Sequence, residues 1–443
     1  MKYLFLDNFR GFSNSIIPLK QVNFLVGENS TGKSSFLKLV NLFSQDNFRQ
    51  FPERSIQEYA DLGSFNDIVS AWSTDRSYFI IGLMTCDDEN LDKVEILLYE
   101  FGQKSDGTVA LLSHTFFLKR KILKLNVENN IVMHYNSFSY ENKTLQKIPE
   151  KLFLQIINKS RKFGKGRNIG KSRLPISQIP IAFLLTMISD RKPGNQKSVK
   201  NEETMDIFMA MYKAFDNLVW IAPIRTKPER FYGSSVNTTF SPDGTHSPYL
   251  LKKTLEGNNS SDFHSKLKSF GQASGLFDTI LTHKFGESQE SPFEILICFK
   301  KEISFNINNV GYGVSQVLPL VVELLNEEDA DVTFAIQQPE IHLHPRAQSA
   351  FGDLIAAQAR LKHQQFLIET HSDYIIDRFR LNLSRNKNNQ ESKISAQVLF
   401  FQRCDTGNRV SIIPISENGK YSSNQPDEFK DFFINEEMQL LEI

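Results

Sequence analysis

The segment from Gly27 to Ser34 has the residue types and the spacing to bind a nucleoside triphosphate. It reads GENSTGKS, follows the apolar run Val22–Val26 and precedes an amphipathic pattern over residues 36–43. After a strand and before a helix, the backbone N–H groups of such a loop offer donors to phosphate oxygens. We expect Lys33 to reach the β- and γ-phosphates of ATP and Ser34 to ligate Mg²⁺. The residues expected to hold the nucleotide are Gly27, Asn29, Ser30, Thr31, Gly32, Lys33, Ser34 and Ser35.

Polar side chains also follow two apolar runs in the second half of the chain. The segment 331–345 ends its apolar run in Gln337 and Gln338, with Glu340 two residues on, and the segment 366–372 ends in Glu369, Thr370 and His371. Carboxyl ends of parallel strands meet at one edge of a sheet, so these side chains are expected to lie close together. A histidine there can bond a γ-phosphate or the attacking water, whereas a lone histidine is more often structural. Both interpretations of His371 stay open.

A glycine-rich turn at residues 309–316 precedes the apolar helical run Val317–Leu325. In one interpretation Ser315 simply caps the helix. In the other, Gly313, Ser315 and Gln316 form a second phosphate-binding helix N-terminus, offered across a dimer interface to the ATP of a neighbouring chain.

The elements that must position these residues predict an α/β fold. Short apolar runs alternate with helical patterns after Asn217, which is typical of a parallel sheet; these runs are Val219–Ala222, Phe293–Phe299, Val332–Ile336, Phe366–Ile368 and Ala396–Phe401. Strand-like runs between residues 78 and 135 predict an antiparallel side sheet, and residues 145–216 have a helical pattern. We therefore predict an N-terminal part at 1–144, a helical insertion at 145–216 and a C-terminal part at 217–443.

A basic run lies inside the expected insertion. Residues 158–173 contain seven lysines and arginines, three glycines and no acid, which predicts a loop. Two interpretations are open: a solvated mobile loop, or a patch that binds the backbone of DNA or RNA. The only aromatic residue in the run is Phe163, so stacking on single-stranded bases is not favoured.

The composition sets limits on partners and compartment. The chain has 443 residues, with 51 Lys plus Arg against 51 Asp plus Glu, so no global field draws it to nucleic acid or to an acidic membrane. Its three cysteines are widely separated and have no metal-ligand spacing, which favours a reducing compartment. The sequence has no uncharged run of membrane-spanning length. We expect a cytoplasmic protein without a membrane partner.

Together and in this order, the motifs resemble the ABC-type ATPase heads of the SMC, RecF and OLD group. The opening LDNFRGF is similar to that of the group, which implies that Arg10 lies near the nucleotide. The resemblance also implies a signature helix at Ser315, a D-loop at His344 and a switch histidine at His371. It further implies a head-to-tail dimer in which each ATP lies between Lys33 of one chain and Ser315 of the other.

The chain departs from this group at the end of the Walker B strand. The group has an acid pair there, one carboxylate for Mg²⁺ and the next to polarise water, whereas this chain has Gln337 and Gln338. A glutamine can bind Mg²⁺ or orient a water through its carbonyl oxygen, but it cannot accept a proton. Either Glu340 or Glu369 supplies the carboxylate of a slow ATPase, or the chain is a scaffold that ATP closes with almost no hydrolysis. Weak turnover is predicted in both cases.

The segments DLGSFNDIV at Asp61, WIAPIRTKPERFYG at Trp220 and FSPDGTHSP at Phe240 are similar to a compact subgroup without coiled-coil arms. The chain resembles the ATPase subunits of two-gene anti-phage systems, with the Septu type favoured over the PARIS type. The segment after Phe401 has no clustered DxD acids, and the nine histidines have no HNH-like spacing, so we expect no nuclease site in the chain. The resemblance then implies a separate nuclease subunit that the chain controls, with the HNH type favoured. The alternative is a RecF-like repair or recombination ATPase that acts directly on DNA.

Overall fold

The computed structural model describes most of the chain, and its internal contacts divide the chain into two compact units. Unit 1 comprises Met1–Lys20, Glu28–Asp216 and Phe401–Ser411, and unit 2 comprises Gln21–Gly27, Asn217–Phe400 and Ile412–Ile443. Among the described residues, no helix combines the length and the apolar character needed to cross a membrane. The residues described are 1–58, 62–87, 90–118, 121–128, 131–139, 149–162, 170–171, 180, 217–233, 239–257, 260–288, 291–299, 303–327, 331–386 and 393–432.

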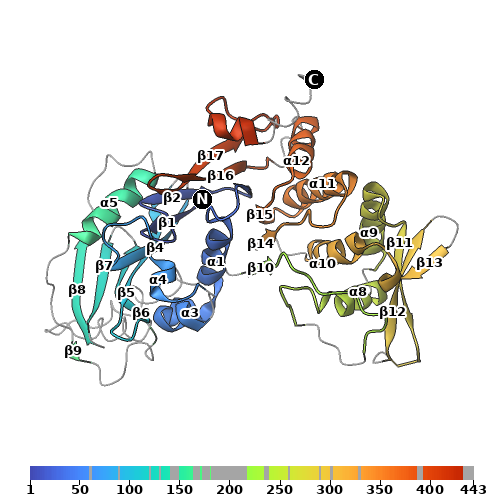
Figure 1. Cartoon of the computed structure of the whole chain (residues 1–443), viewed down its shortest axis with the longest axis horizontal. Coiled ribbons are helices and arrows are strands. Elements are labelled where there is room, and N and C mark those ends of the chain that lie inside the picture. Colours follow the sequence, from blue (N-terminus) through green and yellow to red (C-terminus); the bar gives the residue numbers. More distant parts are fainter. Residues whose placement is uncertain are drawn as a thin grey trace. The chain divides into compact units, whose positions relative to one another are not determined.

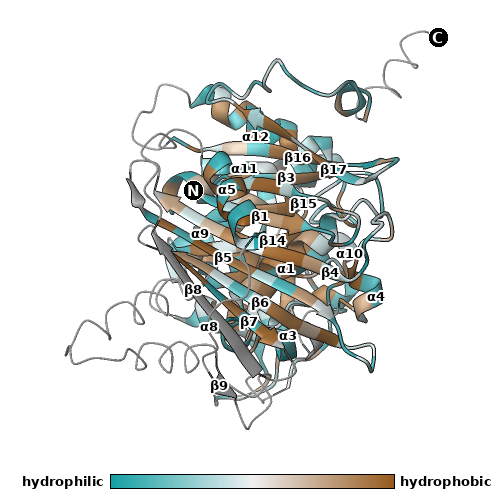
Figure 2. Cartoon of the chain, turned by 90° about the vertical axis from the view of Figure 1, so that its left-hand side faces the viewer, coloured by the Kyte–Doolittle hydropathy of each residue, from teal (hydrophilic) through white to brown (hydrophobic). Residues whose placement is uncertain are grey.

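Unit 1 contains an eight-stranded sheet in the order β2-β1-β4-β5-β6-β7-β8-β9 (Figure 1). All neighbouring strands are antiparallel, so the predicted antiparallel side sheet is confirmed. Apolar residues are concentrated along β4, β5 and β6 (Figure 2). The strands are β1 (Lys2–Asp7), β2 (Ser15–Leu19), β4 (Tyr78–Asp87), β5 (Asn90–Gln103), β6 (Val109–Leu118), β7 (Lys121–Glu128), β8 (Ile131–Ser139) and β9 (Gly170–Lys171).

The helices of unit 1 among the described residues are α1 (Lys33–Ser44), α2 (Asp46–Gln50), α3 (Pro52–Glu58), α4 (Phe65–Ile68) and α5 (Pro149–Arg161). Helix α5 packs the buried residues Leu152, Phe153, Ile156 and Ile157 into one core with Phe5 of β1. The predicted basic loop is therefore wrong over residues 158–161, because these residues form the last turn of α5 and Ser160 is buried there. Most of the expected helical insertion lies outside the described residues, as does most of the basic run after residue 162.

A histidine lies in the aromatic core of unit 1. His114 of β6 is 1% exposed, and its ring stacks 4.0 Å from the ring centroid of Tyr99 and 3.8 Å from that of Phe116. Neither of its nitrogens has a hydrogen-bond partner among the described residues. Burial lowers the pKa of His114 well below its ordinary value, because a charged imidazolium would be desolvated without compensation. His114 is therefore neutral in the folded chain.

This histidine predicts a specific acid sensitivity. An unfolded histidine takes up a proton near pH 6.5, so the contribution of His114 to stability is complete above that pH. It is lost as the pH falls below 6.5, by about 1.4 kcal/mol per pH unit. We expect His114→Phe to remove this part of the loss. Denaturant unfolding at pH 8 and pH 5 measures it, with pH 8 as the internal control, and an identical change for both proteins would contradict the prediction.

Unit 2 is built on a sheet in the order β10-β14-β15-β3-β16-β17, whose last two strands are divided between the units. Strands β10, β14, β15 and β3 are mutually parallel, which confirms the predicted parallel core sheet and mixed α/β fold. All six residues of β3 and of β14 are buried, as expected for strands covered on both faces. The strands are β3 (Val22–Gly27), β10 (Asn217–Ile221), β14 (Val332–Gln337), β15 (Gln365–Glu369), β16 (Ala396–Cys404) and β17 (Gly407–Ile415).

One expected member of this sheet belongs elsewhere. The run Phe293–Phe299 forms β12, which pairs antiparallel with β11 (Thr279–Lys284) and β13 (Ile303–Asn306) in a separate three-stranded sheet. The connections on both sides of β12 are too short for the crossover that a parallel neighbour requires. The helices of unit 2 are α8 (Ser247–Glu256), α9 (Ser260–Ser274), the short η3 (Ile307–Asn309), α10 (Tyr312–Asn326), α11 (Pro345–Leu361) and α12 (Asp373–Arg385).

Candidate functional site

The loop between β3 and α1 has the backbone conformation of a phosphate cradle. Gly27, Ser30 and Gly32 all have positive φ, at 141°, 62° and 99°. A Cβ atom on Gly32 would lie 2.5 Å from the ring of Phe12, so only glycine fits this position. The backbone N–H groups of residues 29–32 have no acceptor among the described residues. The loop thus offers several donors to an anionic ligand, and ATP fits it.

Lys33, the first residue of α1, is already held over this loop. Its side chain is buried, and its Nζ donates to the Glu28 carbonyl oxygen at 2.7 Å. Thr31 Oγ1 donates to the same carbonyl at 2.8 Å, which closes the loop on itself. Ser34 is exposed at the helix N-terminus, the position from which the serine of such a loop ligates Mg²⁺.

Arg10 contacts the same helix from the turn after β1. Its Nη1 donates to Ser35 Oγ at 3.3 Å, and its Nη2 donates to the Leu62 carbonyl. Arg10 has φ 43° and Gly11 has φ 89°. The structure therefore places Arg10 against Ser35 of α1, close in sequence to Lys33. That these residues contact a nucleotide stays a prediction.

In unit 2, the ends of β14 and β15 join an amide to a carboxylate. Gln337 and Glu369 are register partners on the two parallel strands. Gln337 Nε2 donates to Glu369 Oε2 at 2.8 Å, and both residues are buried. The pair consists of an amide and a carboxylate, so it carries at most one negative charge, whereas a pair of carboxylates would carry up to two. The amide and carboxylate oxygens are ligands that suit Mg²⁺.

Glu340 lies nearby and braces the segment of the predicted switch histidine. Its Oε2 accepts from Thr370 Oγ1 at 2.8 Å and its Oε1 accepts from the His371 backbone N–H at 2.7 Å. Burial raises the pKa of Glu340, an effect that these two hydrogen bonds and the charge of Arg225 oppose. Both carboxylate oxygens of Glu340 therefore serve to hold the chain after β15, while the side chain of His371 is exposed.

Arg225 also lies beside Gln337, Gln338 and Glu340, although no sequence motif indicated it. It follows β10, is 3% exposed, and donates to the carbonyl oxygens of Gln337 at 3.0 Å, Gln338 at 3.3 Å and Gln316 at 3.3 Å. Burial lowers the pKa of Arg225 to about 10, and the Glu340 carboxylate raises it, so the guanidinium is charged at neutral pH. It ties α10 to the end of β14, where Gln338 has φ 44°. The signal available in the sequence was an arginine shortly after the apolar run of β10.

The N-terminus of α10 contradicts one of the two sequence interpretations of Ser315, that of a helix cap. The helix starts at Tyr312 with Gly311 as its N-cap, so Ser315 is not the cap. Ser315 is 5% exposed and its hydroxyl donates to the Tyr312 carbonyl at 2.8 Å. Gly311 and Tyr312 are exposed instead, and Gly313 lies so close to His342 that a Cβ would be 2.6 Å from its carbonyl oxygen. Gln316 is buried, with Nε2 3.5 Å from the Thr226 carbonyl.

His344 has a structural contact. It is the N-cap of α11, and its Nδ1 accepts from the Ala347 backbone N–H at 3.4 Å. Of the predicted residues in unit 2, the structure thus brings together Gln316, Gln337, Gln338, Glu340, Glu369 and the backbone of His371 around Arg225.

Among solved structures, several heads of SMC proteins are similar to this chain. An SMC head bound to the C-terminal winged-helix domain of ScpA has 12% identity and a TM-score of 0.43, over 94% of this chain and 98% of that one. The SMC head domain from Thermotoga maritima has 13% identity and a TM-score of 0.39, over 94% and 98%. The SMC head from Pyrococcus furiosus, with an extended coiled coil and bound to the C-terminal domain of ScpA, has 10% identity and a TM-score of 0.41, over 99% and 100%. Likenesses this weak assign neither an activity nor a partner.

Sequence comparison identifies the family, which the likeness to solved structures does not. No curated protein matches the chain. The AAA ATPase domain family matches residues 1–178 and 187–376, which include the loop at Gly27–Ser34, the ends of β14 and β15, and Arg225. Membership of an ATPase family implies nucleotide binding, and the place of the nucleotide at the loop Gly27–Ser34 stays a prediction. The chain belongs to the AAA ATPase domain family.

Proposed function

We propose that this chain binds ATP and Mg²⁺ at the loop Gly27–Ser34 and hydrolyses ATP slowly, with Glu369 as the carboxylate of the reaction. The observation that carries this proposal is the hydrogen bond between Gln337 and Glu369 at the ends of neighbouring strands. It supports a catalytic carboxylate at the end of β15, whereas the SMC, RecF and OLD group has its acid pair at the end of the Walker B strand, which corresponds to β14 here. Bound Mg²⁺ would supply charge neutralisation at the phosphates.

The two candidate carboxylates differ in their contacts. Glu340 already uses both oxygens to hold Thr370 and the His371 backbone. Glu369 lies at the end of β15 beside the amide of Gln337, which donates to its Oε2. A general base must reach the proton that it accepts. We therefore propose that Glu369 contacts the metal and its bound water and that Gln337 is a metal ligand. Gln338 would orient the water, and Glu340 would hold the His371 segment in place.

We further propose that ATP closes a head-to-tail dimer of ABC type. The resemblance of the motif order to the SMC, RecF and OLD group supports this arrangement. The buried position of Ser315 shifts the surface that would meet the partner's ATP to residues 311–313 at the start of α10. Light scattering after size exclusion tests this directly. ATP with Mg²⁺ should convert monomer to dimer, and a constant mass with and without ATP would contradict the dimer.

The function of this ATPase is proposed to be anti-phage defence, as the subunit that controls a separate HNH-type nuclease in the cytoplasm. The resemblance of three segments to Septu-type ATPase subunits supports this proposal. The test is co-purification with the product of the neighbouring gene. A stable stoichiometric complex with a nuclease supports defence. Dimer formation that requires DNA and no such complex would instead support the RecF-like alternative.

A further inference from the structure

The turn that carries Arg10 has an unusual concentration of left-handed backbone. Asn8, Arg10 and Asn14 have φ of 58°, 43° and 41°, and Gly11 has φ 89°. Residues other than glycine rarely adopt this conformation, and they keep it only where surrounding contacts impose it. The contacts that impose it therefore decide where the Arg10 guanidinium lies.

Two sets of contacts hold the middle of the turn. Asn8 Nδ2 donates to the carbonyl oxygens of Asp75 and Tyr78, both at 2.6 Å. The Arg10 backbone N–H donates to the Ile68 carbonyl at 2.8 Å, and Asn408 Nδ2 donates to the Arg10 carbonyl at 2.9 Å. These bonds fix Asn8 and Arg10. At its two ends the turn continues into the paired strands β1 and β2, where Leu6 is the register partner of Ser15.

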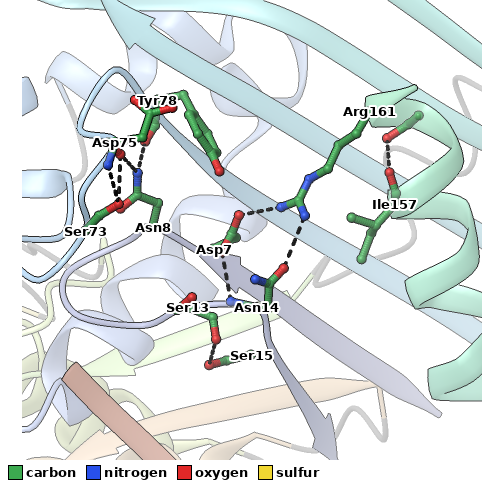
Figure 3. Close-up of polar contacts among 11 residues, drawn as sticks. Asp7, Asn8, Ser13, Asn14, Ser15, Ser73, Asp75, Tyr78, Ile157 and Arg161 are labelled. Atoms are coloured by element: carbon green, nitrogen blue, oxygen red, sulfur yellow. Dashed lines mark hydrogen bonds and ion pairs between the residues drawn. The ribbon is translucent and has the colours of Figure 1, made fainter. Parts of the chain in front are cut away.

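The two ends are joined by a side chain from α5. Arg161 Nη2 forms an ion pair with Asp7 Oδ2, and its Nη1 donates to Asn14 Oδ1 at 3.2 Å. The Asn14 backbone N–H donates to Asp7 Oδ1 at 2.9 Å. Figure 3 shows Arg161 reaching from its helix to both residues. A single guanidinium thus bridges the residue before the turn and the residue that ends it.

The burial of Asp7 makes this bridge more than a surface ion pair. The Asp7 side chain is 5% exposed, whereas that of Arg161 is 31% exposed. Exposed pairs contribute little, but removal of the partner of a buried carboxylate leaves a desolvated charge that forces local rearrangement. The residues that follow Asp7 in the chain are those of the strained turn.

We propose that Arg161 is a positioning residue for Arg10: it bridges Asp7 and Asn14 and thereby holds the Arg10 guanidinium against Ser35 at the phosphate-binding helix. This inference rests on the proposed ATP site. It also removes Arg161 from the basic run as a free contact for nucleic acid, because its guanidinium is bound within unit 1.

The test is the affinity of the full-length chain for a fluorescent ATP analogue with Mg²⁺. The variants are Arg10→Gln, Arg161→Gln, Arg161→Lys and the double variant of Arg10→Gln with Arg161→Gln. Lys162→Gln is the matched control, since it removes the adjacent exposed cation. We expect the dissociation constant to rise roughly 10- to 100-fold for Arg10→Gln and roughly 3- to 30-fold for Arg161→Gln.

A residue that acts through Arg10 leaves a particular signature. The double variant should bind no more weakly than Arg10→Gln alone, whereas independent effects would multiply. Arg161→Lys should recover part of the affinity, because it keeps a cation at Asp7 but cannot bridge to Asn14. Lys162→Gln should bind as the wild type does.

The outcomes separate the inference from the proposed function. Multiplying effects in the double variant, or normal binding by Arg161→Gln beside weak binding by Arg10→Gln, would overturn the inference alone. Normal binding by both Arg10→Gln and Lys33→Met would overturn the ATP site itself. Should Arg161→Gln not fold, as judged by thermal unfolding, Arg161→Lys decides. In that case Arg161→Lys must weaken binding in the chain that has Arg10 and must have no effect in the Arg10→Gln background.

Discussion

Replacing Lys33 with methionine is expected to weaken ATP binding by roughly 100-fold, the loss of charge-assisted hydrogen bonds to the phosphates. The Lys33 side chain is buried and its ammonium is bonded to the Glu28 carbonyl of the same loop, so the charge already lies where the phosphates are expected to bind. Methionine keeps most of the side-chain volume and removes the charge. Titration with a fluorescent ATP analogue measures the change.

Lys38→Met is the matched control for this variant. It removes a cation from the same helix, α1, beyond the loop, and should leave the affinity unchanged. Circular dichroism of Lys33→Met should equal that of the wild type. Unchanged ATP affinity in a folded Lys33→Met protein would rule out this loop as the nucleotide site.

Replacing Glu369 with glutamine is expected to lower steady-state phosphate release by roughly 10²- to 10⁴-fold, the usual effect of losing a general base. ATP affinity should change far less, because Lys33 and the loop supply the phosphate contacts. Glu340→Gln is expected to cost less than about tenfold in rate. Its amide oxygen can still accept one of the hydrogen bonds from Thr370 and His371, so the brace is weakened and not removed.

Two further variants sharpen this test. Glu287→Gln removes an exposed carboxylate of unit 2 and should have no effect on turnover. Adding Gln338→Glu to Glu369→Gln returns a carboxylate to the end of β14 and should restore part of the rate. A large loss for Glu340→Gln together with a small one for Glu369→Gln would reverse the assignment of the two carboxylates.

The elements that present the loop could be predicted because their signals are local. The apolar run of β3, the glycine pattern and the amphipathic α1 each lie within a few residues. Strand β7 was missed because Lys124 interrupts its apolar alternation and is nevertheless buried, where it bonds Glu100 and the Ser160 carbonyl. The pairing of β12 depends on neighbours that periodicity does not identify.

For the candidate site, the sequence indicated residues that lie near one another but not which of them form hydrogen bonds with each other. The sequence placed Gln337 and Glu369 at strand ends, but only register between distant strands makes them partners. It could not assign Glu340 to Thr370 and His371, because such bonds depend on loop geometry. Arg225 was missed since arginine is usually exposed, and its burial follows from three carbonyl groups brought together by folding.

The position of β3 within its sheet has a consequence for the order of assembly. This strand leads into the loop near the N-terminus, yet it lies between β15 and β16, from the last fifth of the chain. During synthesis, its buried residues have no sheet partner until β15, which ends at Glu369, has left the ribosome, and the second partner, β16, follows later. Pairing over such sequence distances is slow, and an apolar strand without partners is prone to mispairing. The phosphate cradle is thus among the first parts of the chain to be made and among the last to gain its support.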